Sequence, residues 1–322
     1  MTATAQAAAL TRVEDGSPTT VTRGGRDRAA SWLFTGPFLI LYLLFLVGPV
    51  LVGLVISLFN TATVGSGLGS WVGLRNYADV LANGDFWSSV WHSALFTVFT
   101  TPPLVLLPLV AAVLAARVAR GRWFFRIAFF APYVVPSSVV CLIFAFMYLP
   151  EIGLISKVFD WVGVAEPNFL GSTGGAWLAV TLLTVWWTFG FNFILYTAAI
   201  QDIPEEVYEA SLVDGAGPWQ QIRSITLPLL RSTMSLVLIL QLLASLKVFD
   251  QIYILLTGGP DYSTRPAIEY VYDTGFTSYR GGYASAATMV YFLMLVLVAA
   301  GWALLRRSPT SSSAGAGSEA TG

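Results

Sequence analysis

Long apolar stretches separated by short polar segments dominate this chain. About 20 apolar residues are needed to cross a bilayer, and an ionisable group near its centre is costly. Because every backbone polar group in lipid must be satisfied within its own segment, such stretches are predicted to be helices, which makes the fold class all-α. Six stretches are long and charge-poor enough, at about 32–58, 92–116, 127–149, 176–200, 229–256 and 285–305.

Composition supports a polytopic membrane protein. The 322 residues are 56% hydrophobic and 11% charged, with a mean hydropathy of +0.70, which is unlike a soluble globular domain. A net charge of -1 offers no polybasic surface for nucleic acid. Residues 1–31 and 308–322 lack apolar periodicity and are predicted to be disordered tails of a membrane domain at 32–307. The first stretch is longer than the apolar part of a signal peptide, so it should be retained as an anchor.

The distribution of Lys and Arg predicts the orientation, because these residues concentrate on the cytoplasmic side. With the N-terminus inside, the five residues on the other side are Arg75, Lys157, Lys247, Arg265 and Arg280. The other twelve of the 17 are cytoplasmic: Arg12, Arg23, Arg26, Arg28, Arg117, Arg120, Arg122, Arg126, Arg223, Arg231, Arg306 and Arg307. Both termini and the polar segment 201–228 are therefore predicted to face the cytoplasm.

The polar segment 201–228 has its own local signals. Asp202 is a candidate N-cap, and Pro204 suits a first helical turn. Gly215 supplies the φ freedom for a sharp turn, and a second short segment follows at 219–225. The pattern predicts a helix, a glycine turn and a second helix at the membrane surface.

This segment resembles the cytoplasmic loop of the integral-membrane permeases of binding-protein-dependent ABC importers, which carries Glu-Ala-Ala, then Gly, then Leu-Pro. Ser211 is the one departure, and an ordinary amphipathic loop is the alternative interpretation. In that family the loop inserts into a groove of the ATPase. The resemblance implies a type I ABC importer permease fold in a bacterial plasma membrane, and it assigns ATPase coupling to Glu209, Ala210, Ser211, Asp214, Gly215, Ala216, Leu227 and Pro228.

The same resemblance implies several partners: a second homologous permease, an ABC ATPase dimer, an extracytoplasmic solute-binding protein and membrane lipid. The chain has no Walker A motif, because neither Lys157 nor Lys247 stands in a GxxxxGK[ST] pattern. ATP and Mg are therefore expected on the partner ATPase, with no cofactor in this chain. With one histidine and no nucleophile motif, it is predicted to be a non-catalytic transport subunit.

Polar residues inside two apolar stretches are candidates for a substrate passage. Lys247, Asp250 and Gln251 stand at i, i+3 and i+4, which predicts one helix face toward a cavity. The alternatives are an ion pair that fixes packing, or a span that ends earlier. The preceding stretch contributes aromatic surface and hydrogen-bonding groups suited to a sugar, although aromatic stripes also face lipid or pack in cores: Trp187, Thr188, Phe191 and Asn192.

Two further stretches are similar to the carbohydrate branch of the family, in particular to the first permease of maltose and glycerol-3-phosphate importers. They are Trp71–Tyr77 and the run from Phe249 to Pro260. The resemblance implies a sugar cargo held between the helices that flank the coupling loop. Lys247 departs from a maltose-type site, so it binds an acidic sugar or simply neutralises Asp250.

Other interpretations stay open. An ion- or proton-coupled secondary transporter would use Lys247 and Asp250 as a relay, but it leaves the loop at 201–228 unexplained. A third possibility keeps the ABC class and changes the cargo to glycerol-3-phosphate or a polyol. Cys141 is interpreted as a packing residue and His92 as a structural or interfacial residue, with no metal site. The third stretch is expected to kink at its prolines, Pro132 and Pro136.

Overall fold

The computed structural model describes residues 25–65, 67–118 and 121–306, and these form two compact units, one up to Val52 and one from Gly53 onward. The first unit contains α1 (Gly25–Tyr42), the π-helical segment η1 (Leu43–Val47) and the start of α2 (Gly48–Ile56). The predicted tails lie outside the described residues, except that the backbone of residues 25–31 is helical. The prediction of disorder through residue 31 is wrong there, because Ala29 and Ala30 let the helix extend beyond the apolar stretch.

The second unit is built from helices, with one short hairpin, β1 (Phe59–Asn60) paired antiparallel with β2 (Ser70–Trp71). Its longer helices are α4 (Gly84–Ala116), α5 (Arg122–Val134), α6 (Ser137–Met147), α8 (Thr173–Gln201), α12 (Arg231–Leu246) and α15 (Gly281–Arg306). The shorter ones are α3 (Arg75–Leu81), α7 (Leu154–Val162), α9 (Glu205–Val213), α10 (Pro218–Gln221), η2 (Ile222–Thr226), α11 (Leu227–Leu229), α13 (Asp250–Leu256), α14 (Ala267–Tyr272) and η3 (Asp273–Thr277).

Four helical segments of the described chain are long and apolar enough to cross a membrane, or six if each of two bent helix pairs counts as one span. The continuous ones are Trp32–Ile56, Gly84–Ala116, Thr173–Gln201 and Gly281–Leu305. Helix α4 starts earlier than its apolar stretch, because the side chain of Asn83 accepts hydrogen bonds from the backbone N–H groups of Asp85 and Phe86. The cap fixes the helix start outside the apolar run.

The first bent pair is α5 and α6, which meet at an angle of 92° around Val135 and Pro136. The kink expected from the prolines is found, because proline cannot donate a backbone hydrogen bond. The carbonyl of Val135 accepts a hydrogen bond from Trp187 Nε1 at 3.0 Å. A backbone acceptor freed by the break therefore gains a partner from α8, as a chain in lipid requires.

The second bent pair is Pro218–Leu229 with Arg231–Leu246, which meet at 62°. A further break, after α12, lies where one continuous helix was predicted. Helix α12 ends at Leu246, Phe249 has φ -146° and ψ -65°, and α13 begins at Asp250. The prediction of an unbroken helix over 229–256 is therefore wrong. The break contains neither Gly nor Pro, so tertiary contacts stabilise it: the Tyr291 hydroxyl donates to the Leu246 carbonyl, which the helix no longer uses.

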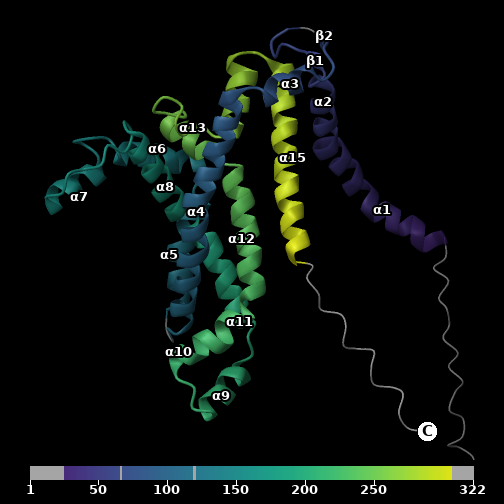
Figure 1. Cartoon of the computed structure of the whole chain (residues 1–322). Coiled ribbons are helices and arrows are strands. Elements are labelled where there is room, and N and C mark those ends of the chain that lie inside the picture. Colours follow the sequence, from purple (N-terminus) through teal and green to yellow (C-terminus); the bar gives the residue numbers. More distant parts are fainter. Residues whose placement is uncertain (1–24, 66, 119–120, 307–322) are drawn as a thin grey trace, which may run out of the picture. The chain divides into compact units, whose positions relative to one another are not determined.

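Three groups of buried side chains hold the second unit together. One joins α4, α6, α8 and α13, a second joins α4, α8 and α12, and a third joins α3, α4, α14 and α15. Figure 1 shows α4, α5, α8 and α12 alongside one another, with α9 and α10 beyond one end and the β1–β2 hairpin at the other. Helices α5 and α8 approach so closely that a Cβ at Gly190 would collide with the Phe129 carbonyl.

Candidate functional site

A cavity of about 180 Å³ lies beside the break between α12 and α13. Polar side chains face it from three helices, and its lining consists of Phe96, Thr184, Thr188, Gln241, Ala244, Ser245, Lys247, Val248, Phe249, Asp250 and Gln251. Interrupted helices are where membrane proteins place polar groups, because irregular backbone is tolerated beside protein or water. The cavity is thus the first candidate site.

Lys247, Asp250 and Gln251 all line this cavity, but they do not share one helix face as predicted. The helix stops before Lys247 and restarts at Asp250, so helical spacing does not relate them. Within the part of the chain that the structure describes, no ion pair joins Lys247 to Asp250. The Asp250 carboxylate instead accepts a hydrogen bond from Ser137 Oγ at 2.7 Å, which links the two helix breaks.

The four residues predicted on α8 separate into different environments. Thr188 lines the cavity, and its hydroxyl donates to the Thr184 carbonyl at 2.6 Å. Trp187 and Phe191 pack against the Tyr133 ring of α5, with centroid distances of 6.0 and 5.3 Å. These two aromatic rings stand outside the cavity lining.

Asn192 is 1% exposed and joins three helices. Its amide nitrogen donates to the Leu104 carbonyl of α4 at 2.8 Å and to Gln241 Oε1 of α12 at 3.2 Å. Gln241 then donates to Ser245 Oγ, which lies 2.9 Å from Thr100 Oγ1. The network gives buried polar groups partners from neighbouring helices and fixes the walls of the cavity.

Gln241 and Ser245 were missed by the reasoning from sequence. They stand four residues apart inside an apolar stretch, which is the same spacing that singled out Thr188 and Asn192. The signal was present in the helical period. Because both side chains are neutral, this spacing is a weaker signal than the charged residues Lys247 and Asp250 that follow.

The second candidate site is the loop between α8 and α12. Helix α9 is followed by a turn in which Gly215 has φ +78°, and α10 continues into η2. This confirms the predicted helix, glycine turn and helix. Asp202, however, is the C-cap of α8 and not the N-cap of α9, which follows Pro204 directly. Only Ile203 and Pro204 lie between Asp202 and the first residue of α9, so Asp202 still belongs to the end of α8.

Ser211 has a structural role in this loop. It is 9% exposed, its hydroxyl donates to the Tyr208 carbonyl at 2.7 Å, and it accepts a hydrogen bond from Gln221 Nε2 at 2.9 Å. The Tyr208 hydroxyl lies 3.0 Å from Thr226 Oγ1. These contacts tie α9 to the segment after the turn.

The remaining predicted coupling residues lie mostly on the outer surface of this loop. Glu209, Ala210, Asp214 and Gly215 are exposed, and Ala216, Leu227 and Pro228 are half-buried. Two apolar side chains between them are also uncovered: Val213, at 89%, and Leu212, at 64%, which also lines the cavity behind the loop. An exposed apolar patch on a polar loop is typical of an interaction surface.

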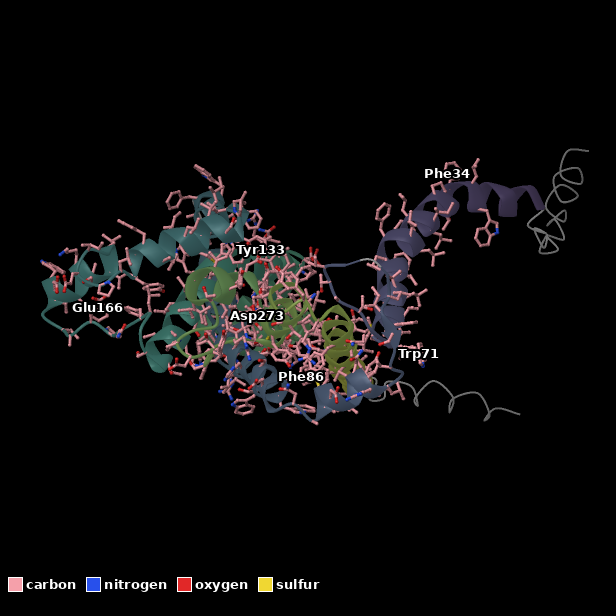
Figure 2. The ribbon with its side chains drawn as sticks, turned by 90° about the horizontal axis from the view of Figure 1, so that it is seen from above. Phe34, Trp71, Phe86, Tyr133, Glu166 and Asp273 are labelled. Atoms are coloured by element: carbon pink, nitrogen blue, oxygen red, sulfur yellow. The ribbon has the colours of Figure 1, made fainter. Side chains whose placement is uncertain are left out.

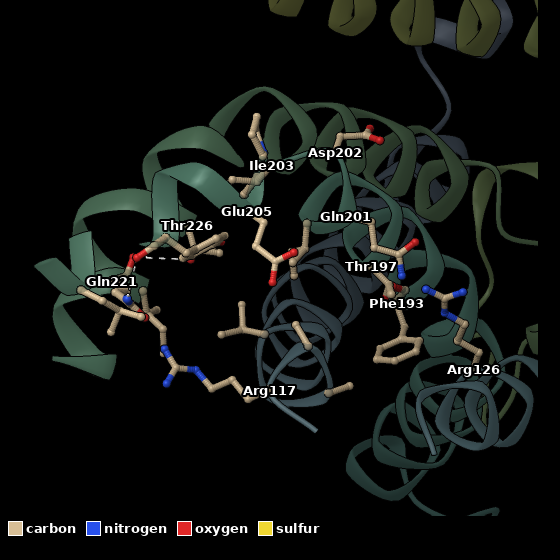
Figure 3. A pocket seen from close by; sticks show the side chains of 18 residues that line it. Arg117, Arg126, Phe193, Thr197, Gln201, Asp202, Ile203, Glu205, Gln221 and Thr226 are labelled. Carbon is tan, nitrogen blue, oxygen red and sulfur yellow. Dashed lines mark hydrogen bonds between the residues drawn. The ribbon is translucent and has the colours of Figure 1, made fainter. Parts of the chain in front are cut away.

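A larger cavity of about 740 Å³ lies behind the loop, between α9, η2 and the ends of α4, α5 and α8 (Figure 3). Arg117, which follows α4 directly, donates a hydrogen bond to the Pro218 carbonyl at 2.5 Å. The loop is therefore attached to the end of a long helix, but it is not packed flat against the bundle.

The opposite end of the unit carries a buried acidic residue, Glu269, which is 1% exposed (Figure 2 labels the nearby Asp273). Burial and the Asp273 carboxylate raise the pKa of Glu269 to about 8, while the Arg265 guanidinium opposes this shift. Arg265 Nη1 lies 3.8 Å from Asp273 Oδ2, and its guanidinium lies 4.3 Å from the Tyr262 ring centroid.

His92 contacts the backbone of Arg265, which lies beside Glu269 and Asp273. Its Nδ1 lies 3.1 Å from the Arg265 carbonyl, and its ring packs against Trp177. Cys141 is fully buried and free. These contacts agree with a packing role for Cys141 and a structural role for His92.

Comparison with known proteins gives consistent matches. The family described as binding-protein-dependent transport system inner membrane component matches residues 109–308. The probable ABC transporter permease protein YurN of Bacillus subtilis is 33% identical over 278 residues, which is 84% of this chain and 94% of that protein. The sulfoquinovosyl glycerol transport system permease protein SmoG of Agrobacterium fabrum is 32% identical over 275 residues, covering 85% and 89%.

A solved structure shares the fold. It is a chain of a bacterial alginate ABC transporter in complex with a periplasmic protein that holds an alginate pentasaccharide. The TM-score is 0.78 at 23% sequence identity, and the match covers 88% of this chain and 97% of that chain.

Proposed function

Because the chain belongs to the family of binding-protein-dependent transport system inner membrane components, we propose that it is one permease subunit of an ATP-driven sugar importer. It would form half of the translocation pathway and couple to an ATPase through residues 201–228. The observation that carries this proposal is the coupling loop, whose exposed residues Leu212 and Val213 stand on a frame held by Ser211 and Gln221. Such a surface suits a groove on a partner.

The partners would be a second homologous permease, an ATPase dimer and an extracytoplasmic solute-binding protein. ATP and Mg would be bound by the ATPase, so this subunit would be non-catalytic. Closure of the ATPase dimer on ATP would move the two coupling loops. The tie between Arg117 and the Pro218 carbonyl offers a direct route from that loop to α4. Both termini would lie on the cytoplasmic side with the loop.

The cargo would pass the cavity beside Lys247. Sugar hydroxyls need short polar partners, and Thr188, Gln241 and Gln251 supply both donors and acceptors. Lys247 is exposed and makes no ion pair among the described residues, so its ammonium can bind an anionic group. A sugar that carries an acidic group is favoured, and the sulfo-sugar named for the similar permease SmoG has this chemistry.

The test is reconstitution of this chain in liposomes with its second permease, ATPase and binding protein. Uptake and ATP hydrolysis would be measured over a panel of neutral and acidic sugars. We expect hydrolysis to rise with one class of sugar and uptake to require ATP inside the vesicle with the ATPase. Uptake that persists without an ATPase but collapses with a protonophore would contradict the proposal and favour a proton-coupled transporter that uses Lys247 and Asp250.

A further inference from the structure

The cavity behind the coupling loop lies where two candidate membrane spans end. Two candidate spans end beside it, Gly84–Ala116 and Thr173–Gln201, and the residues that follow them, Arg117 and Asp202, line its wall. Its volume of about 740 Å³ is within the range of small-molecule sites. If these spans cross the bilayer, the cavity lies near the membrane surface, where lipid head groups are available.

The cavity brings charges of both signs together without pairing them. In Figure 3 the Glu205 carboxylate points into the open centre, with Arg117 and Arg126 on opposite sides. No ion pair among the described residues involves any of the three. Arg117 has one N–H donor on the Pro218 carbonyl, which leaves further donors of its guanidinium available.

Apolar side chains form the part of the wall that faces the helices. Val113 of α4, Phe193 and Ile200 of α8, and Ile222 of η2 line it. Val113, Phe193 and Ile200 are almost fully covered by their neighbours, so the accessible apolar surface comes from half-buried residues such as Ile203 and Ile222. The cavity therefore has a polar mouth with both charges and some apolar surface beside it, which suits an amphipathic molecule.

We propose that this cavity binds a zwitterionic phosphate ester, with the phosphate on Arg126 and the ammonium on Glu205. Arginine matches phosphate because its planar fork donates two hydrogen bonds, and a carboxylate accepts from an ammonium N–H. An aminophospholipid head group and a soluble ester such as phosphoethanolamine share this chemistry. The site is separate from the sugar passage and does not depend on the cargo.

The experiment measures ligand binding by native mass spectrometry on the full chain in detergent. The probes are phosphatidylethanolamine, phosphatidylcholine, phosphatidylglycerol and soluble phosphoethanolamine. Choline has no N–H to donate, and the glycerol head group has no cation. We expect phosphatidylethanolamine to be retained about tenfold better than the other two lipids, the effect of one charge-assisted hydrogen bond.

Two variants and two matched controls test the assignment. Glu205→Gln should remove the preference for phosphatidylethanolamine, and Arg126→Gln should weaken retention of all three lipids. Glu206→Gln and Arg231→Gln change neighbouring charges outside the cavity lining, and both should retain lipid as the unaltered chain does. Size-exclusion profiles would establish that each variant is folded, and Arg126→Lys provides a variant that keeps the charge.

The outcomes separate the sources. Binding of phosphoethanolamine with the same dependence on Glu205 and Arg126 would support the site and identify a soluble ester as an occupant. Equal retention of all three lipids, unchanged in Glu205→Gln and Arg126→Gln, would overturn the proposal. Because binding is read without transport, failure here would leave the proposed import function untouched.

Discussion

Gln221 Nε2 donates a hydrogen bond of 2.9 Å to Ser211 Oγ across the glycine turn of the coupling loop. Ser211 is where the chain departs from the alanine of the family pattern, so the departure is used to join α9 to the segment after the turn. Ser211→Ala should leave the Gln221 amide with only a 3.5 Å contact to the Tyr208 carbonyl and cost about 1 kcal/mol. Faster hydrogen exchange in α9 would measure this loss of stability.

The matched control for this change is Ser224→Ala, at an exposed serine of η2. It should leave exchange in α9 unchanged. Equal protection in Ser211→Ala and in the unaltered chain would show that the hydrogen bond does not stabilise the loop.

Gly215 should be sensitive to substitution for a backbone reason. Its φ of +78° is strained for a residue with a Cβ, although nothing lies within 4 Å of that position. Gly215→Val should therefore cost about 1–2 kcal/mol or more and displace the turn. We expect reconstituted transport to fall while basal ATP hydrolysis continues. Gly217→Val is the control, because Gly217 has φ -71° and equally open space. Equal losses of transport in both variants would show that the positive φ at Gly215 is not the cause.

Lys247 should decide between acidic and neutral cargo. Lys247→Gln removes the ammonium and keeps a hydrogen-bonding side chain, so uptake of an acidic sugar should fall by about tenfold or more, as expected for a lost charge-assisted hydrogen bond. Uptake of neutral sugars should change little. Lys157→Gln, at an exposed lysine of α7, is the control. A parallel loss for both classes of sugar would mean that Lys247 acts on packing.

Trp187 should stabilise the kink between α5 and α6. Trp187→Phe keeps an aromatic ring but removes the donor to the Val135 carbonyl, which would cost about 1–3 kcal/mol if that acceptor stays unsatisfied. Trp186→Phe changes the adjacent residue, which is half exposed, and should be close to neutral. Thermal unfolding in detergent compares the two, and indistinguishable midpoints would count against the role of the hydrogen bond.

Glu269 should make the loop before α14 dependent on pH. Its pKa rises from an ordinary 4.5 to about 8 in the folded chain, so the folded state holds a proton that the unfolded state releases. The stabilisation is complete below pH 4.5 and is lost as the pH rises through about 8, when the buried carboxyl ionises beside Asp273. Hydrogen exchange at residues 257–273 should accelerate over this window.

Glu269→Gln removes the titration and should flatten this dependence on pH. Glu151→Gln, at an exposed glutamate, should preserve it. An unaltered chain whose exchange, corrected for the intrinsic rate, is constant from pH 5 to about 9 would exclude a buried carboxyl that titrates in this range.

Local signals predicted much of this molecule. Hydropathy predicted the all-α membrane fold, because a helix that crosses lipid must be apolar over its whole length. The residues from Glu209 to Pro228 predicted the family and the turn at Gly215, which requires positive φ. Pro136 likewise predicted the kink after α5. In each case the physical cause lies within a few residues of its effect.

Other features depend on residues far apart in the sequence. The break at Lys247 has no local breaker, and the Leu246 carbonyl finds its donor on Tyr291 of α15. Asn192 does not line the cavity, because its amide donates to acceptors on α4 and α12. Local sequence therefore predicts the helical character of the long apolar stretches and the turn at Gly215, but not the interruption between α12 and α13. Which polar groups face a cavity depends on the tertiary structure, because buried donors and acceptors must find partners across helices.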